Sequence, residues 1–135
     1  MIKNKGLRHL AIRVSDIPRA VDFYRRVFGM RIVWQPDPDN AYLSSGCDNL
    51  ALHRGEAGDP AAQVLDHLGF IVATTGDLEA GYRWAKESGI DIVNPLRRHR
   101  DGSMSFYLRD PDGNVIQALF EPEISPMVFE AQGKS

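Results

Sequence analysis

The sequence predicts an α+β protein of two βαβββ modules, whose curved mixed sheets form a cup. The first observation is a repeat: residues 9–14 (His-Leu-Ala-Ile-Arg-Val) resemble residues 67–72 (His-Leu-Gly-Phe-Ile-Val). Second, an amphipathic stretch follows each block and ends at a glycine, Gly29 or Gly89, before a β-prone run. Third, the two histidines are almost as far apart along the chain as the two glycines, so whole modules repeat.

The first module is expected to span residues 7–53. Ser15 or Asp16 can cap a helix over residues 16–28, and Gly29 supplies the left-handed conformation that ends it. Apolar residues recur at helical spacing along this helix: Ile17, Ala20, Val21, Tyr24, Val27 and Phe28. Three β-prone runs follow it: residues 31–34, 41–44 and 49–53.

The second module is expected to span residues 64–121 and to repeat that order. Its helix is predicted from about residue 77 to residue 88, with Leu78, Tyr82 and Ala85 on one face. Three β-prone runs follow: residues 90–94, 103–108 and 114–120, the last two joined by turn residues 110–114. The Gly- and Pro-rich residues 54–63 are the expected linker, and residues 122–135 a tail within one domain of 135 residues.

Composition limits the function classes. Hydrophobic residues make up 43% of the chain and charged residues 25%, which is typical of a globular protein. The net charge of −2 disfavours a nucleic-acid partner, and the chain has no apolar run long enough for a membrane span. Cys47 is the only cysteine, so no intrachain disulfide can form. We therefore expect a soluble cytoplasmic protein.

Alternation along the strands separates two faces. Leu10, Ile12 and Val14 form an aliphatic row that must be buried against a helix. His9 and Arg13 then lie on the opposite face, toward the cup. The same argument puts His67 on the cup side of its own strand.

These motifs resemble the vicinal oxygen chelate superfamily, the glyoxalase/bleomycin-resistance/extradiol-dioxygenase group. The resemblance rests on residues 9–16 (His-Leu-Ala-Ile-Arg-Val-Ser-Asp), 67–70 (His-Leu-Gly-Phe) and 106–116 (Phe-Tyr-Leu-Arg-Asp-Pro-Asp-Gly-Asn-Val-Ile). It covers roughly residues 7–121 and implies a homodimer. It also implies a divalent metal ion in the cup, held from the first, fourth, fifth and eighth strands.

Residue by residue, the resemblance assigns His9 and His67 to two metal-ligand positions. The usual eighth-strand glutamate is Gln117 here, and the fourth-strand glutamate of glyoxalase-like members is Ala51. Neither can accept a substrate proton, which argues against glyoxalase I activity. Extradiol dioxygenases place two histidines and one carboxylate around iron, a set that His9, His67 and the amide oxygen of Gln117 match more closely. The ion itself is left open between iron, manganese, zinc and nickel.

Two residues are candidates to replace the missing carboxylates. His53 lies two positions after Ala51, hence on the same face, and is a candidate acid–base residue. Glu121 lies four positions after Gln117 and requires a bulge or a shift of its strand, so His53 is preferred. Tyr107 also points to the cup and is a candidate substrate-binding phenol or proton donor.

Three basic residues are candidates for substrate binding: Arg13 by its strand parity, and Arg98 and His99 in a basic loop, residues 97–100. Each candidate also has a structural interpretation: the histidines and Tyr107 as ordinary hydrogen-bonding residues, Arg13 in a salt bridge, and the basic loop as solvated surface. Trp34 and Trp84 are interpreted as packing residues.

Two functions are favoured over a third, a structural or regulatory dimer, for which the sequence has no specific feature. The first is a divalent-metal-dependent enzyme that acts on a small molecule with two adjacent oxygens, closer to a dioxygenase than to a glyoxalase. The second is a metal-free binding protein that sequesters a small molecule, like bleomycin-type resistance proteins. The missing carboxylates favour the second function, and the retained histidine pair favours the first.

Overall fold

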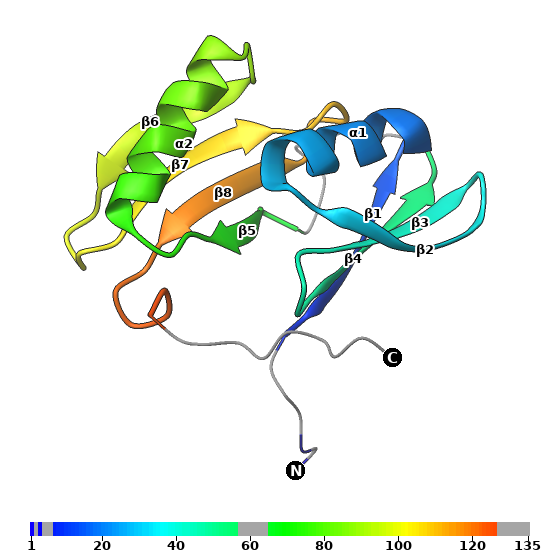
Figure 1. Ribbon diagram of the computed structural model, residues 1–135, viewed down its shortest axis with the longest axis horizontal. Helices are drawn as coiled ribbons and strands as arrows, with labels where there is room; N and C mark the ends of the chain where they lie inside the picture. The colour runs from blue at the N-terminus through cyan, green and yellow to red at the C-terminus, as the bar shows by residue number, and fades with distance from the viewer. Residues whose placement is uncertain (2, 4–6, 57–64, 127–135) are drawn as a thin grey trace. The chain divides into compact units, whose positions relative to one another are not determined.

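The computed structural model describes residues 1, 3, 7–56 and 65–126. Residues 57–63 of the predicted linker and residues 127–135 of the predicted tail lie outside the described residues. The described chain forms two compact units, residues up to 56 and residues 65–126, which correspond to the two modules. Figure 1 shows the helix and sheet of each.

The first module is a four-stranded mixed sheet with one helix. Its elements are β1 (His9–Val14), α1 (Ile17–Phe28), β2 (Arg31–Asp37), β3 (Asn40–Ser44) and β4 (Asn49–Arg54). The strand order is β1-β4-β3-β2, with β1 parallel to β4 and the other neighbours antiparallel. β4 therefore lies between β1 and β3 in the sheet (Figure 1).

Helix α1 begins and ends where the sequence predicts. The Asp16 carboxylate accepts a hydrogen bond from the Arg19 N–H at 2.9 Å, which satisfies one free donor of the first turn. Gly29 ends the helix at φ 65°, a left-handed conformation that glycine adopts without steric cost. The apolar side of α1 contacts β3 and β4, and its buried residues are Ile17, Ala20, Val21, Phe23 and Tyr24.

The second module repeats this order. Its elements are β5 (Leu68–Ile71), α2 (Thr75–Glu87), β6 (Ile92–Arg98), β7 (Met104–Arg109) and β8 (Val115–Phe120). The sheet order is β5-β8-β7-β6, with β5 parallel to β8 and the other neighbours antiparallel. Helix α2 begins earlier than predicted because the Thr74 hydroxyl accepts from the Asp77 N–H at 3.0 Å. The predicted fold of two βαβββ modules is confirmed.

Two strands are longer than predicted. The sequence placed their ends at residues 34 and 94, before Pro36 and Pro95, whereas β2 continues to Asp37 and β6 to Arg98. Both are edge strands, which pair on one side only, so a proline can face the open side without loss of a hydrogen bond of the sheet. Both strands also pair with their neighbours through register shifts. Arg97 and Arg98 therefore belong to β6 rather than to a loop. Similarly, Arg54 ends β4 rather than beginning the linker.

The predicted alternation is confirmed in both modules. In β1, Ile12 and Val14 are buried while His9 and Arg13 are exposed. The sheet face opposite the helix is called the inner face below. Trp34 packs edge-on against Tyr42, 4.9 Å between ring centroids, although it is 53% exposed, and Trp84 is 40% exposed. In the part of the chain that the structure describes, neither helix has the length and apolar character of a membrane span.

Candidate functional site

His9 contacts Asn49 on the inner face of the first module. The two residues are partners in the β1–β4 register, and Asn49 Nδ2 lies 2.7 Å from His9 Nδ1. An amide nitrogen only donates, so His9 Nδ1 accepts this bond and the ring proton resides on Nε2. In this state neither ring nitrogen of His9 presents a free lone pair. Asn49 Oδ1 is buried and has no hydrogen-bond partner among the described residues.

His53 lies further along the same face and contacts a different asparagine. Its Nδ1 is 2.6 Å from Asn40 Oδ1, and its ring stands edge-on to Tyr42, 6.4 Å between centroids. Since the amide oxygen can only accept, Nδ1 carries the proton and Nε2 keeps its lone pair. The sequence-predicted parity of His53 is therefore correct, and its orientation suits a proton acceptor.

Two other inner-face positions of the first module are now defined. Ala51 is fully buried, beside Tyr42 in the β3–β4 register, so it supplies no donor where family members carry glutamate. Arg13 is the β1 partner of His53 and is exposed, not enclosed as parity alone suggested. No ion pair involves Arg13 within the described ranges, so the expected salt bridge is not formed there. Its guanidinium is available to an external anion.

His67 in the second module is oriented by a carboxylate. Its Nδ1 lies 2.6 Å from Asp66 Oδ2, and its ring stands edge-on to Tyr107, 5.3 Å between centroids. A carboxylate accepts the Nδ1 proton, which leaves the Nε2 lone pair free toward the inner face. This is the orientation in which histidine commonly binds metal ions. The two equivalent histidines therefore differ in their available nitrogens.

Gln117 occupies the predicted place on β8. The register sets it between Gly69 of β5 and Tyr107 of β7, on the inner face. The alternative residue, Glu121, is not a substitute: β8 pairs with β7 without a register shift, and the Glu121 carboxylate accepts from the N–H groups of Glu123 and Ile124, both at 3.0 Å. That carboxylate caps a turn after β8.

A cavity of about 610 Å³ opens on this inner face, between the β6–β7 turn and the middle of the sheet. It contains three of the predicted site residues beside Gln117: Arg98, His99 and Tyr107. The complete lining is Arg97, Arg98, His99, Arg100, Asp101, Ser103, Tyr107 and Gln117. A neighbouring cavity of about 530 Å³ shares Arg97, His99 and Tyr107 with it.

The cavity carries an excess of positive charge. No ion pair engages Arg97, Arg98 or Arg100 in the residues that the structure describes. The one carboxylate in the lining, Asp101, accepts from the Ser103 hydroxyl at 2.7 Å and from the Ser103 N–H at 2.9 Å. The Ser103 hydroxyl, and then its N–H, lower the pKa of Asp101. That carboxylate is thus held by its own turn, and within the described ranges it forms no ion pair with these arginines.

The donor set does not fit a tightly held metal ion. Among the described residues, no group of three His, Cys, Asp or Glu side chains could hold one. Ala51 and Gln117 occupy the two positions where the resemblance implies carboxylates. A histidine that binds a metal ion through Nε2 needs an acceptor for its Nδ1 proton, but His9 Nδ1 faces the amide nitrogen of Asn49. Only His67 has the expected metal-ligand orientation. His9 and His67 belong to separate modules, each described by itself.

Sequence reasoning missed the partners that orient the histidines. Asn40, Asn49 and Asp66 are short polar residues without a motif, and only the strand register brings the two asparagines beside histidines. Arg97 is not among the predicted substrate-binding residues, because the sequence predicts residues 97–100 as a loop. The alternation of side chains along β6, had the strand been extended past Pro95, would have placed Arg97 on one face of the sheet.

Comparisons with known proteins agree with this fold. Residues 6–118 match the model of the Glyoxalase/Bleomycin resistance protein/Dioxygenase superfamily. The chain is 29% identical over 116 residues to the metallothiol transferase FosB of Staphylococcus haemolyticus, which covers 84% of this chain and 81% of that protein. It is 27% identical to biphenyl-2,3-diol 1,2-dioxygenase 3 of Rhodococcus globerulus, over 89% of this chain and 65% of that one.

A solved structure of a similar protein has the same fold. The glyoxalase/bleomycin resistance protein/dioxygenase from Alicyclobacillus acidocaldarius superposes with a TM-score of 0.72 at 26% identity, covering 94% of this chain and all of the other. Both the sequence match and the two-module architecture extend over most of the chain. The chain therefore belongs to the Glyoxalase/Bleomycin resistance protein/Dioxygenase superfamily.

Proposed function

We propose that this protein binds a small anionic molecule on the inner face of its second module. The observation that carries the proposal is the cavity of about 610 Å³ with three arginines that have no ion-pair partner in the described chain. Planar guanidinium groups bind carboxylates and phosphates through paired hydrogen bonds. Arg98 with Arg97 would hold the anionic group, and His99 would add a donor or a charge when protonated.

Tyr107 and Gln117 lie in the same cavity and supply neutral hydrogen-bonding groups. The Tyr107 hydroxyl can donate or accept, and the Gln117 amide can do both, so they suit the uncharged part of a ligand. Arg13 in the first module is a further candidate for an anion, since it is exposed and has no ion pair within the described ranges. This arrangement supports a ligand that joins an acidic group to a polar body.

The experiment is an NMR titration of the isotope-labelled protein with inorganic phosphate, oxalate and phenyl phosphate. We expect saturable shifts of the backbone amides at residues 97–103 and of Tyr107. Each directly bound arginine contributes about 1.5–3 kcal/mol, so Arg98→Gln should weaken binding by about tenfold to hundredfold. His99→Gln should weaken it less.

The matched control is Arg83→Gln, which removes the same charge from the exposed surface of α2. Equal weakening by Arg83→Gln and Arg98→Gln would indicate unspecific charge attraction and contradict the proposal. Absence of saturable binding for all three probes would contradict it as well. Binding should also weaken as salt is raised, because exposed charges are screened.

A second candidate function is a divalent-metal-dependent enzyme, and the His67–Asp66 contact at 2.6 Å favours it. His9, His67 and Gln117 would hold iron, manganese, zinc or nickel, with His53 and Tyr107 as acid–base residues. The ion would act as a Lewis acid on two adjacent substrate oxygens or, as iron, activate dioxygen. The names of the two relatives, a metallothiol transferase and a dioxygenase, support this class, with a dioxygenase-like reaction preferred.

Metal analysis of the untagged protein separates the two candidates. Near-stoichiometric metal that is lost in a His9→Ala/His67→Ala variant would support the enzyme. Protein that stays empty after anaerobic loading with all four ions would exclude the metal-dependent candidate and leave the binding protein. The anion titration is unaffected by this result, since no arginine of the cavity is changed.

We also propose that residues 1–135 act as one domain, in a homodimer located in the cytoplasm. Family resemblance supports the dimer, because modules in this superfamily often pair between chains. Light scattering coupled to gel filtration should give twice the 15.1 kDa chain mass. A mass that stays at one chain over a wide concentration range would contradict the dimer.

A further inference from the structure

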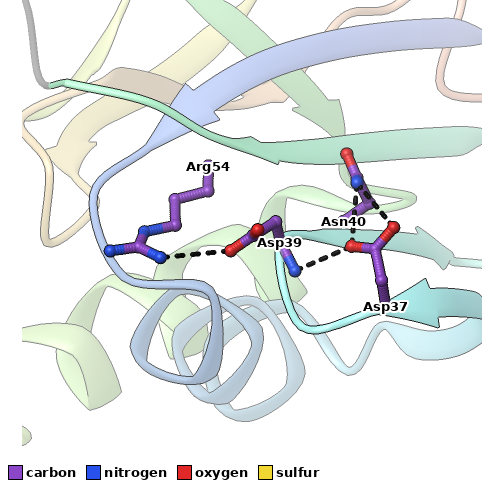
Figure 2. A network of polar contacts seen from close by, with 4 residues as sticks. All are labelled: Asp37, Asp39, Asn40 and Arg54. Atoms are coloured by element: carbon purple, nitrogen blue, oxygen red, sulfur yellow. Dashed lines mark hydrogen bonds and ion pairs between the residues drawn. The ribbon is translucent and has the colours of Figure 1, made fainter.

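We infer that Asp37 and Asn40 are positioning residues that hold His53 with its proton on Nδ1 and its lone pair on Nε2. The inference goes beyond anion binding in the second module, because none of these residues lines that cavity. It assigns a function to a network in the β2–β3 turn of the first module (Figure 2). Hydrogen bonds connect the Asp37 carboxylate to the His53 imidazole through Asn40.

The first step fixes the amide of Asn40. Asn40 Nδ2 lies 2.9 Å from Asp37 Oδ1 and 3.0 Å from Asp37 Oδ2, as Figure 2 shows. An ionised carboxylate only accepts hydrogen bonds, so the amide must turn its nitrogen toward Asp37. The amide oxygen of Asn40 therefore points away from Asp37.

The second step fixes the tautomer of His53. Asn40 Oδ1 lies 2.6 Å from His53 Nδ1, and Asn40 and His53 are partners in the β3–β4 register. An amide oxygen only accepts, so the Nδ1 atom must carry the proton. A neutral imidazole has one such proton, which leaves Nε2 as the acceptor. Asp37 thus determines the state of a ring that it does not touch.

The turn itself holds the carboxylate in place. Asp37 Oδ1 also accepts from the Asp39 N–H at 2.8 Å. Asp39 pairs with Arg54 at the end of β4, 3.2 Å between Oδ1 and Nη1, and its carbonyl accepts from the Arg54 N–H at 2.8 Å (Figure 2). The network therefore connects β2, β3 and β4 around His53.

His53 therefore presents Nε2 as a hydrogen-bond acceptor on the inner face. Its charged and titratable neighbours are Arg13, its partner on β1, and Tyr42 on β3, with Asp37 behind Asn40. The Nε2 lone pair suits the O–H or N–H group of a small ligand, or removal of a proton from it. His9 on the same face contacts a donor instead, so the two histidines have opposite polarity toward a ligand.

The test is ¹⁵N NMR of the histidine side chains in the full chain at a pH where the imidazoles are neutral. The long-range spectrum distinguishes the protonated ring nitrogen from the unprotonated one. We expect wild-type His53 in the Nδ1–H form. Asn40→Leu and Asp37→Ala should move a large fraction to Nε2–H, and Asp37→Glu should retain more Nδ1–H than Asp37→Ala.

Asp39→Ala is the matched control, because it removes a carboxylate from the same turn and breaks the Arg54 pair without touching Asn40 or His53 through its side chain. It should leave the tautomer of His53 unchanged. Unchanged backbone amide signals along α1, in the same module, report an intact fold in every variant. Should Asn40→Leu fail to fold, Asp37→Ala, at an exposed position, decides the question.

Two results would overturn the inference: a wild-type His53 in the Nε2–H form, or an Asp37→Ala variant whose tautomer equals that of wild type. The second result would mean that Asn40 alone sets the ring and that Asp37 merely shapes the turn. Neither result bears on the anion site, which is tested by titration of residues in the second module.

Discussion

The two modules share one scaffold but present different chemistry on their inner faces. In both, the first strand pairs in parallel with the fourth, and a histidine lies at the start of that first strand (His9) or directly before it (His67). The first module surrounds that face with amides and aromatic rings, including Asn40 and Tyr42. The second carries three arginines that no ion pair engages in the described ranges. Register fixes which positions meet, while residue identity determines what they bind.

The two equivalent histidines, His9 and His67, also differ in their contacts. His9 contacts an amide nitrogen and His67 a carboxylate, so the same position presents Nε2–H in one module and a free lone pair in the other. A repeated backbone therefore does not imply a repeated ligand set.

The largest effect is expected from removing the positive charge of the second module. An Arg97→Gln/Arg98→Gln/Arg100→Gln variant should lose at least about a hundredfold in affinity for phenyl phosphate, because charge-assisted hydrogen bonds contribute about 1.5–3 kcal/mol each. Isothermal titration calorimetry measures the loss. A variant within a few-fold of wild type would show that the arginines do not hold the anion.

A gain of metal affinity is expected from restoring the family carboxylate. Gln117→Glu adds a charged oxygen donor on the inner face of β8, near His67, and should raise the affinity for Zn²⁺ or Mn²⁺ by about tenfold, roughly 1.4 kcal/mol. Competition with a chromogenic chelator provides the readout. Equal affinities, or a gain that survives His67→Ala, would contradict a site at these residues.

The two histidine–asparagine pairs should differ in their contribution to stability. Asn40→Leu removes the amide that both Asp37 and His53 contact and leaves His53 Nδ1 without its acceptor, so it should lower the free energy of unfolding by about 1–2 kcal/mol. Asn49→Leu also removes a buried oxygen that has no partner among the described residues, so its cost should stay within about 0.5 kcal/mol. Urea unfolding compares them, and equal losses would refute the distinction.

The smallest effect concerns the pH dependence of the β6–β7 turn. The Ser103 hydroxyl lowers the pKa of Asp101 in the folded protein below the ordinary 3.8. The ionised Asp101 carboxylate therefore stabilises the fold fully at any pH above its pKa in the unfolded chain, and this stabilisation is lost as the pH falls through its pKa in the folded protein. Asp101→Asn should therefore flatten the acid side of the stability curve below about pH 4. A curve with the same slope as wild type would contradict this role.

The fold was predictable because alternation and helix capping are local signals. The aliphatic row of β1 and the left-handed Gly29 are readable from neighbouring residues alone. The extensions of β2 and β6 past Pro36 and Pro95 were not, since an edge position depends on the strand order.

The candidate site was only partly predictable for the same reason. The inner-face parity of His53, Tyr107 and Gln117 follows from alternation. The orienting contacts of His53 and His9 depend on which asparagine lies across the register, which no motif encodes. Within the described ranges Asp101 bonds to Ser103 and forms no ion pair with Arg97, which no motif encodes.

The most direct test of the central claim is an NMR titration that observes the arginine Nε–H groups during addition of phenyl phosphate at low salt. We predict saturable shifts for Arg97, Arg98 and Arg100 of the second module, with one shared dissociation constant, and none for Arg83 on α2. Shifts of equal size and slope for all four arginines would contradict a built anion site on the inner face of the second module.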